Sequence, residues 1–457
     1  MSIAVPELIP TAPQTNASAR TPGVDLSWLS EKIEYRRFQD CIHCGLCTAS
    51  CPTYVETGNE NDGPRGRIYL MRGVTDGRIG VSDEVRHHLE LCLDCRACES
   101  ACPSGVKYGQ LIEPFKVALQ RSAKGANRPP WIQSLILKHL FPYPGRVRLA
   151  LQPAALLQKW GVLDWLERVG LTKLLPPTLR RMQMMLPDNL SSRPTSPLPE
   201  VLPAVGPQRA RVALFLGCVA DAMTPGTNHA TARVLQRNGC EVVTLEGQVC
   251  CGAIDYHSGF EEPALKLARK NIELFNAGDF DAVIVNAAGC GAMLKDYAHL
   301  LDHGTPGEAT KFVAKVKDIS EFLVTLGPIA PTHPIAERTV TYHDACHLCH
   351  GQQVRSQPRQ LLAMIPGIDL RPLEETELCC GAAGTYNLTQ PEMSERLGVR
   401  KMDRIEETGA STVVTGNIGC ILQIARKVKE RKLPIRVAHP IDLLDEAYGG
   451  AEGLPER

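Results

Sequence analysis

The sequence predicts a multidomain α+β protein, with a helical cysteine-rich module and a helical proline-rich connector in front of two tandem α/β domains. Three observations support this order. A run of four cysteines and a proline occurs twice between residues 41 and 103. Prolines then recur from residue 121 to 211 and leave room only for short helices. From Arg211 onward, apolar β-rich runs alternate with helical stretches, which favours parallel sheets flanked by helices.

The repeated run has the spacing Cys-x2-Cys-x2-Cys-x3-Cys-Pro. Its two copies are Cys41, Cys44, Cys47, Cys51 and Pro52, then Cys92, Cys95, Cys98, Cys102 and Pro103. Thiolates suit iron–sulfur clusters, and this spacing is typical of bacterial ferredoxins, in which the fourth cysteine of each run ligates the other cluster. We therefore expect two [4Fe–4S] clusters. The predicted ligand sets are Cys41, Cys44, Cys47 and Cys102 for cluster 1, and Cys92, Cys95, Cys98 and Cys51 for cluster 2.

The segment between the two runs favours an α-helical ferredoxin module, which we place at residues 25–122. Forty residues separate Cys51 from Cys92, more than a compact module of small hairpins needs. The insert contains two helical stretches, and Ser82 is a candidate N-cap for the second. Arg65 and Arg67 begin the first stretch, where they either offset the charge of a thiolate-bound cluster or simply face solvent.

Composition limits the classes of partner and compartment. The chain has 457 residues with 50 Lys plus Arg and 50 Asp plus Glu, so its net charge points to no nucleic-acid partner. Residues 1–24 are rich in Pro, Thr and Ala, which predicts a disordered tail, and they lack the pattern of a secretory signal. Eighteen cysteines in such a chain indicate metal binding or redox chemistry in a reducing compartment. We expect a cytoplasmic protein, with a peripheral place on the inner face of the cell membrane as the alternative.

The connector, residues 123–208, is basic and holds three of the four tryptophans: Trp131, Trp160 and Trp165. A helix starting near Pro153 would align Trp160 with leucines on one face. Basic charge beside such a face is also found in helices that lie on membranes. We favour a helical connector packed between domains, with its basic face meeting a partner subunit, and keep membrane contact as the alternative.

The C-terminal half contains a second cysteine repeat, which predicts two copies of one domain at residues 209–330 and 331–457. Its landmarks are offset by 128 to 130 residues between the copies. The predicted metal ligands are Cys218, Cys250, Cys251 and Cys290 in the first copy, and Cys346, Cys379, Cys380 and Cys420 in the second. Each copy includes a Cys-Cys-Gly tripeptide. The cysteines follow predicted strands, and the carboxyl ends of parallel strands are where open α/β sheets bind ligands.

These motifs together resemble a known family. The strings CIHCGLCTASCPTY, DGPRGRIYLMRGV and CLDCRACESACPSGVKYG, followed by two Cys-Cys-Gly units, are similar to the iron–sulfur subunit of glycolate oxidase, also called glycolate dehydrogenase. The resemblance implies an electron-transfer subunit that is inactive alone. FAD-containing partner subunits would oxidise glycolate to glyoxylate, and this chain would pass electrons toward a quinone or another respiratory acceptor. D-Lactate or another 2-hydroxy acid stays open as the substrate.

One departure from a related architecture bears on the cysteine-rich sites. The catalytic subunit of heterodisulfide reductase ends each repeat in Cys-x-x-Cys, whereas Ala287 and Asn417 occupy those positions here. This argues against disulfide reduction and leaves a further iron–sulfur cluster or another metal as alternatives at these sites. The alternatives for the whole chain are a heterodisulfide-reductase-like subunit, a lactate or glycerol-3-phosphate dehydrogenase subunit, and a zinc-binding scaffold. Zinc sites, however, favour pairs of cysteines separated by longer loops.

Two cysteines remain, Cys240 and Cys349. Cys240 begins a predicted strand and is expected to be a packed core thiol. Cys349 belongs to Cys346-His347-Leu348-Cys349-His350, the signature of covalent haem, but the repeat assigns Cys346 to the second site. We expect His343, His347 and His350 to lie near that site. No Gly-x-Gly-x-x-Gly follows a predicted strand and no phosphate-binding loop is present, so we expect no flavin or NAD on this chain and assign no catalytic residue.

Overall fold

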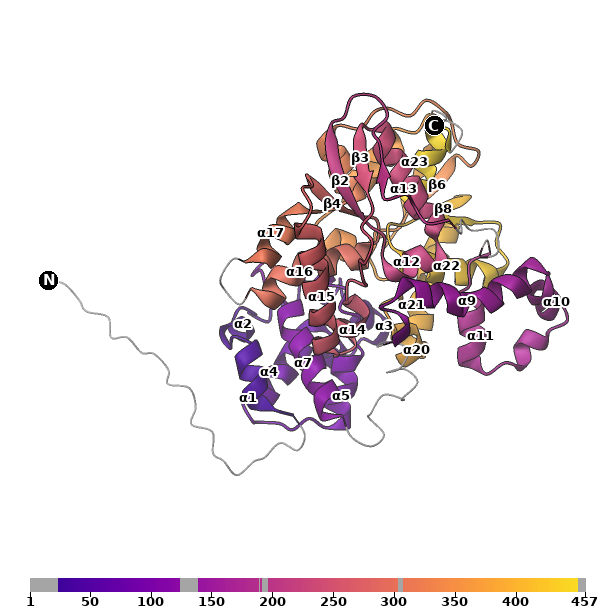
Figure 1. The fold of residues 1–457 in the computed structure, drawn as a ribbon. Helices are drawn as coiled ribbons and strands as arrows, with labels where there is room; N and C mark the ends of the chain where they lie inside the picture. Colours follow the sequence, from indigo (N-terminus) through magenta and orange to yellow (C-terminus); the bar gives the residue numbers. More distant parts are fainter. Residues whose placement is uncertain (1–23, 124–138, 189, 191–195, 303–306, 451–457) are drawn as a thin grey trace.

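The computed structural model describes residues 24–123, 139–188, 190, 196–302 and 307–450. Helices predominate and two separate sheets are present, which confirms the predicted multidomain class. In Figure 1 the helical N-terminal module lies below the two sheets, and residues 144–184 project from one side. Residues 1–23 of the predicted tail and Trp131 lie outside the described residues, whereas Val24 is buried against the module.

From residue 24 to 123 the chain forms helices and turns without a strand, as the length of the insert predicts. The helices are α1 (Leu26–Lys32), α2 (Arg36–Gln39), α3 (Pro52–Thr57), η1 (Glu60–Asp62), α4 (Pro64–Thr75), α5 (Asp83–Glu90), α6 (Ala97–Ser100) and α7 (Gly109–Ser122). The Ser82 hydroxyl accepts a hydrogen bond from the Val85 amide, 3.2 Å away, so the predicted N-cap of α5 is confirmed. Phe38, Met71 and Phe115 are fully buried between these helices.

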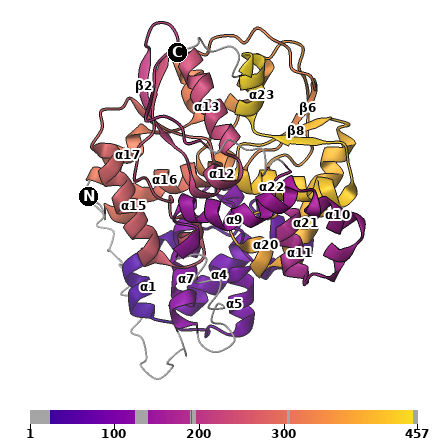
Figure 2. The same cartoon turned by 45° about the vertical axis from the view of Figure 1, so that its right-hand side comes forward.

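The connector is helical where it is described. It comprises α9 (Pro144–Lys159), α10 (Val162–Arg168), η4 (Leu171–Leu174) and α11 (Pro177–Met184). Helix α9 packs on α12 (Cys218–Met223), and Arg181 of α11 donates a 3.0 Å hydrogen bond to the Asn387 carbonyl. Helices α10 and α11 lie at one edge of the molecule (Figure 2). Trp160 and Trp165 remain 68% and 56% exposed, so neither is buried against the described part of the chain. Among the described residues, no helix has both the length and the apolar character that a bilayer span requires.

The first sheet has the order β1-β3-β2-β4-β5, and all its neighbours are parallel except β1 with β3. Its strands are β1 (Val201–Leu202), β2 (Ala210–Phe215), β3 (Cys240–Val243), β4 (Ala282–Val285) and β5 (Val316–Asp318). The helices are α12, α13 (Pro225–Arg237), α14 (Ala253–His257), α15 (Glu261–Asn276), α16 (Ala288–Leu301), α17 (Glu308–Lys315) and α18 (Ile319–Leu326). Strand β4 is buried along its whole length, as expected for a central parallel strand.

The second sheet repeats the four parallel strands in the same order, β7-β6-β8-β9. These are β6 (Thr339–Tyr342), β7 (Asp369–Arg371), β8 (Thr412–Val414) and β9 (Arg436–Ala438). The helices are η5 (His347–Gly351), α19 (Gln357–Ala363), α20 (Tyr386–Thr389), α21 (Pro391–Glu407), α22 (Ile418–Arg431) and α23 (Pro440–Ala447). The matching strand order agrees with the duplication that the cysteine spacing predicts.

The two sheets share one hydrophobic core. Leu214 and Val234 of the first domain belong to the same buried cluster as Val340 and Ile441 of the second. Helix α13 packs directly on α23 at this junction. There, the Arg233 guanidinium lies 2.6 Å from the Asp445 carboxylate, and Arg237 lies 3.4 Å from it. The duplicated domains are therefore joined through their interiors.

Removing Asp445 would leave Arg233 and Arg237 without their buried counter-charge. We expect Asp445→Ala to lower the free energy of unfolding by about 3 kcal/mol, the cost typical of breaking a buried ion pair. Anaerobic urea denaturation followed by circular dichroism measures this loss. The matched control is Asp369→Ala, because Asp369 pairs with Arg371 at the surface and should contribute less than about 0.5 kcal/mol. Equal losses for the two variants would contradict this account of the junction.

Candidate cluster sites

The second cysteine run forms a single enclosed site together with one cysteine of the first run. Cys92, Cys95, Cys98 and Cys51 line the same small cavity, and Cys51 reaches it from the position just before α3. Burial, followed by the neighbouring Cys95, Cys92 and Cys51, raises the pKa of the Cys98 thiol. This grouping is the one that an exchange of fourth cysteines between the two runs requires.

The first run gathers close to the surface with the other exchanged cysteine. Burial raises the pKa of Cys47 to about 11, and Cys41 and Cys102 contribute to the rise, so these three thiols lie near one another. The charge of Cys44 also raises the pKa of Cys41. Cys44 is exposed, and next to it Ile42 and Leu46 are 67% and 61% exposed. Site 1 (Cys41, Cys44, Cys47, Cys102) therefore borders solvent, whereas site 2 (Cys92, Cys95, Cys98, Cys51) is interior.

Both runs bend by the same backbone device. The residue before the second cysteine and the residue after it have positive φ angles in each copy: His43 and Gly45, then Asp94 and Arg96. A left-handed conformation costs a non-glycine residue roughly 1–2 kcal/mol. His43, Asp94 and Arg96 adopt this conformation despite its cost. It lets the chain curl so that three closely spaced cysteines can face one centre.

Arg67 provides a buried positive charge beside site 2. Its side chain is 1% exposed and lies 3.9 Å from the Cys51 sulfur, held by hydrogen bonds to the Thr53 hydroxyl and the His88 carbonyl. Burial opposes its charge, but the charges of Cys92 and other neighbours raise its pKa overall. Arg65 instead pairs with Glu60 nearer the surface. Of the two interpretations of these arginines, Arg67 fits the electrostatic one, and Arg65 is a partly exposed helix residue.

In the first cysteine-rich domain, four thiols meet at the carboxyl edge of the sheet. Cys218 begins α12 after β2, Cys250 and Cys251 follow β3, and Cys290 lies in α16 after β4. The Cys218 sulfur donates to that of Cys250 across 3.2 Å. Hydrogen bonds from Cys218 and Cys251 lower the pKa of Cys250, while hydrogen bonding with Cys250, together with burial, raises the pKa values of Cys218 and Cys251.

The second domain repeats this arrangement with Cys346, Cys379, Cys380 and Cys420. Hydrogen bonds from Cys346 and Cys380 lower the pKa of Cys379, and a hydrogen bond from Cys380 lowers that of Cys420. His343 lies here too, within 4.8 Å of the Cys380 and Cys420 sulfurs. We call the two sets the first and second CCG sites. In each, four convergent thiols fit a cation-bearing centre such as an iron–sulfur cluster or a metal ion.

The expectation that His347 and His350 lie with His343 at the second CCG site is wrong in part. The short helix η5 points both side chains toward the N-terminal module. His347 Nε2 lies 2.9 Å from the Asp94 carbonyl, and His350 Nδ1 lies 3.0 Å from the Ser100 hydroxyl. Cys349, in the same turn, is fully buried, as is Cys240 in β3. The second cysteine of the haem-like signature, Cys349, is thus inside the fold, which disfavours covalent haem.

Site 2 and the second CCG site are direct neighbours, which the sequence analysis did not foresee. Cys95 packs in one apolar cluster with Cys346 and Cys379. Burial and then the charge of Cys379 raise the pKa of Cys95. The Tyr386 hydroxyl donates to the Leu91 carbonyl across 2.8 Å and fixes the loop of the second run on α20.

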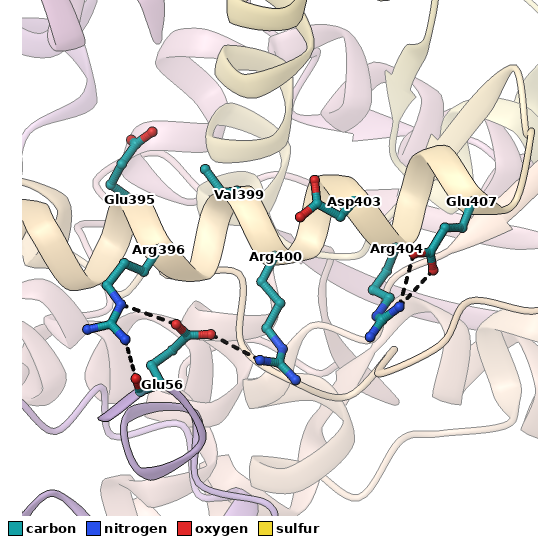
Figure 3. Close-up of a pocket in the computed structure, with 8 residues that line it drawn as sticks. All are labelled: Glu56, Glu395, Arg396, Val399, Arg400, Asp403, Arg404 and Glu407. Carbon is teal, nitrogen blue, oxygen red and sulfur yellow. Dashed lines mark hydrogen bonds and ion pairs between the residues drawn. The ribbon is translucent and has the colours of Figure 1, made fainter. Parts of the chain in front are cut away.

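Ion pairs hold the same two parts together at the surface. Figure 3 shows Glu56, at the end of α3, between Arg396 and Arg400 of α21. Its carboxylate lies 3.2 Å from each guanidinium. The groove that these residues line is charged and open, so it is not suited to a small apolar ligand. These ion pairs instead hold the N-terminal module in one position on the second domain.

A buried polar cluster joins site 2 to the first domain, and sequence reasoning missed it. His257 Nδ1 lies 3.1 Å from the Asp94 carboxylate, and Arg96 bridges Glu113 and Asp296 at 2.7 and 2.8 Å. Burial opposes ionisation of Asp94, but Lys116 and His257 lower its pKa overall. In the sequence, this cluster is indicated only by the position of Asp94 and Arg96 inside the second cysteine run.

Two sites of four cysteines in a helical module, followed by a site of four cysteines on each of two paired sheets, define an iron–sulfur electron-transfer protein. Comparison with known families agrees with this class. Residues 37–106 match a 4Fe-4S dicluster domain, and residues 212–295 and 340–425 each match a cysteine-rich domain. Residues 128–186 match the linker region of the glycolate oxidase iron-sulfur subunit. The chain belongs to the family of glycolate oxidase iron–sulfur subunits.

Two relatives cover nearly the whole chain, and a third covers about half of it. The probable glycolate oxidase iron-sulfur subunit of Bacillus subtilis is 41% identical over 92% of this chain and 96% of its own length. The glycolate oxidase iron-sulfur subunit of Escherichia coli is 33% identical over 89% of this chain and 93% of its own length. Lactate utilization protein A of Shouchella clausii is 33% identical over 51% of this chain and 98% of its own length.

The buried charge of Arg67 should tune site 2. A positive charge favours the more negative, reduced state of a bound cluster, so Arg67→Met should lower its reduction potential. For one electron and a charge several ångströms away at an effective dielectric constant of about 20, the shift is on the order of 100 mV. Anaerobic redox titration followed by electron paramagnetic resonance (EPR) measures it. Arg78→Met is the control, because Arg78 is exposed and pairs with Asp76; a shift of the same size there would contradict the assignment.

Proposed function

We propose that this chain is the electron-transfer subunit of a complex that oxidises glycolate to glyoxylate. FAD-containing partner subunits take two electrons from the substrate, and this chain passes them one at a time toward a quinone or another respiratory acceptor. The observation that supports this most is the succession of thiol sites, from exposed site 1 through interior site 2 to the second CCG site in contact with Cys95.

The proposed ligands follow the grouping of sulfur atoms. Site 1 and site 2 each hold one [4Fe–4S] cluster, and the CCG sites hold further iron–sulfur or metal centres. A cluster bound by thiolates accepts and releases single electrons. The protein's own residues set the conditions: Arg67 balances negative charge, Tyr386 and Leu91 fix the loop, and the apolar cluster around Cys95 excludes water between neighbouring sites.

By this account, electrons pass between this chain and a partner at site 1. The exposed apolar residues Ile42 and Leu46 beside Cys44 offer a docking surface at site 1. The chain needs no substrate pocket of its own, because the flavoprotein partners bind the 2-hydroxy acid. We place the complex in the cytoplasm, with peripheral contact to the inner face of the cell membrane as the alternative to a purely soluble complex.

Reconstitution with the partners tests the proposed function. The chain is co-expressed with candidate flavin subunits, and glycolate-dependent reduction of a dye that accepts electrons from iron–sulfur centres is assayed, with D-lactate in parallel. We expect activity to require this chain and to fall at least tenfold in Cys95→Ser, because site 2 then lacks a ligand. Cys240→Ser removes a buried thiol outside all four sites and should retain activity in the fraction that folds. Activity that persists without this chain contradicts the proposal.

We infer also that the exposed side of the connector binds a partner subunit. Trp160 and Trp165 are exposed there, and so is Leu174, at 79%, in η4, which contacts α10. A double variant, Trp160→Ala with Trp165→Ala, should fold normally and co-purify less with the flavoprotein subunits. Ile329→Ala, an exposed apolar residue elsewhere, is the control. Unchanged co-purification, together with reduced flotation on anionic vesicles, would assign this surface to the membrane instead.

A further inference from the structure

We infer that His343 is a metal ligand at the second CCG site, which therefore presents four sulfur atoms and one imidazole nitrogen, whereas the first CCG site presents sulfur only. This inference rests on the proposal that the CCG sites hold iron–sulfur or other metal centres. It adds a ligand that the cysteine pattern does not contain.

A hydrogen bond to the backbone holds His343 in the tautomer that a metal ligand requires. His343 Nδ1 lies 2.9 Å from the Thr376 carbonyl oxygen, which can only accept, so Nδ1 bears the proton. In the neutral ring, Nε2 then bears no proton and has a lone pair that can bind a metal. A backbone carbonyl that binds the other ring nitrogen is the usual partner of metal-ligating histidines.

The other ring nitrogen faces the sulfur atoms. His343 is fully buried and its side chain hydrogen-bonds Cys420, while Nε2 has no oxygen or nitrogen partner among the described residues. The ligand atoms of His343, Cys380 and Cys420 lie within 4.8 Å of one another. With bond lengths of about 2.0–2.3 Å, one metal atom could reach all three after a small closure of the side chains.

The support behind the ring is rigid. The Thr376 hydroxyl lies 2.9 Å from both the Tyr342 carbonyl and the Asp344 carboxylate. Arg359 holds Asp344 by two hydrogen bonds of 2.8 and 2.6 Å. Thr376, and with it the carbonyl that accepts from His343, is thereby anchored to the end of β6. The hydrogen bond from Nδ1 to this anchored carbonyl therefore fixes the orientation of the His343 ring.

At the position of His343, the first CCG site has a phenylalanine, Phe215. Phe215 stands three residues before Cys218, as His343 stands three residues before Cys346. The Phe215 ring is buried against Phe275, with ring centroids 5.9 Å apart, and provides no donor. On the other side of the second site, the Asn417 amide lies 3.6 Å from the Cys420 sulfur, as a hydrogen-bond donor. Asn417 thus supports a thiolate rather than supplying a ligand.

The added ligand makes the two CCG sites chemically different. At the second site a neutral imidazole joins four sulfur ligands, whereas the first site offers the four sulfur ligands without it, and ligand identity is one of the factors that set the reduction potential of an iron–sulfur centre. We therefore expect the two centres to differ in reduction potential, with the imidazole-bearing centre next to Cys95 of site 2.

The test uses the anaerobically purified full chain as wild type, His343→Phe and His350→Gln. His343→Phe copies the first site, and His350→Gln changes a neighbouring histidine that binds Ser100. Pulsed EPR of the reduced protein measures nitrogen coupling, and the rate of metal release to a chelator is measured in parallel. The chelator readout does not depend on the spin state of the centre. Signals from sites 1 and 2 show whether each variant is folded.

We expect the strong nitrogen coupling of a bound imidazole in the wild type and in His350→Gln, and its loss in His343→Phe. We also expect one site's share of the metal to leave His343→Phe at least about tenfold faster. Equal release rates in all three proteins would overturn the inference. So would a coupling that survives in His343→Phe. Since these measurements need no flavoprotein, they can succeed where glycolate-dependent activity fails, and the reverse also holds.

Discussion

The contact of the Cys92–Cys95 loop with the second cysteine-rich domain determines how this molecule is organised. Cys95 touches the cluster formed by Cys346 and Cys379, and the Tyr386 hydroxyl holds the loop through the Leu91 carbonyl. The ion pairs of Glu56 with α21 reinforce this contact at the surface. Because the loop also belongs to site 2, the same few residues shape a ligand site and an interdomain contact. A ferredoxin module that could otherwise act as a mobile carrier is fixed in place.

Much of the ligand arrangement could be predicted, because the chemistry depends on local spacing. The three closely spaced cysteines of each run can face one centre only if the chain curls tightly, and the positive φ angles at His43 and Asp94 show that it does. The 128–130-residue repeat likewise predicted two domains with the same strand order. The helical form of the N-terminal module followed from the length between Cys51 and Cys92.

The rest depends on contacts between residues far apart in the sequence. Nothing near Arg67 in the sequence shows that its side chain turns inward to Cys51 while Arg65 pairs with Glu60. His343, His347 and His350 were equivalent candidates, and only the tight turn of η5 sends two of them toward Asp94 and Ser100. The cluster of Asp94, Glu113 and His257 needs three segments to meet. Spacing predicts ligands within a segment, whereas burial and tertiary packing decide their surroundings.

The hydrophobic core shared by the two sheets also constrains biosynthesis. Leu214 and Val234 pack with Ile441, which lies in α23, the last helix of the described chain. A nascent chain that has exposed only the first domain therefore still lacks part of the apolar surface that covers its sheet. The sheet of the first domain therefore gains its full apolar cover only after α23 has been synthesised. Its thiols Cys218, Cys250 and Cys251 lie in a separate buried cluster whose residues all precede β6, so they can be enclosed earlier than the sheet is completed.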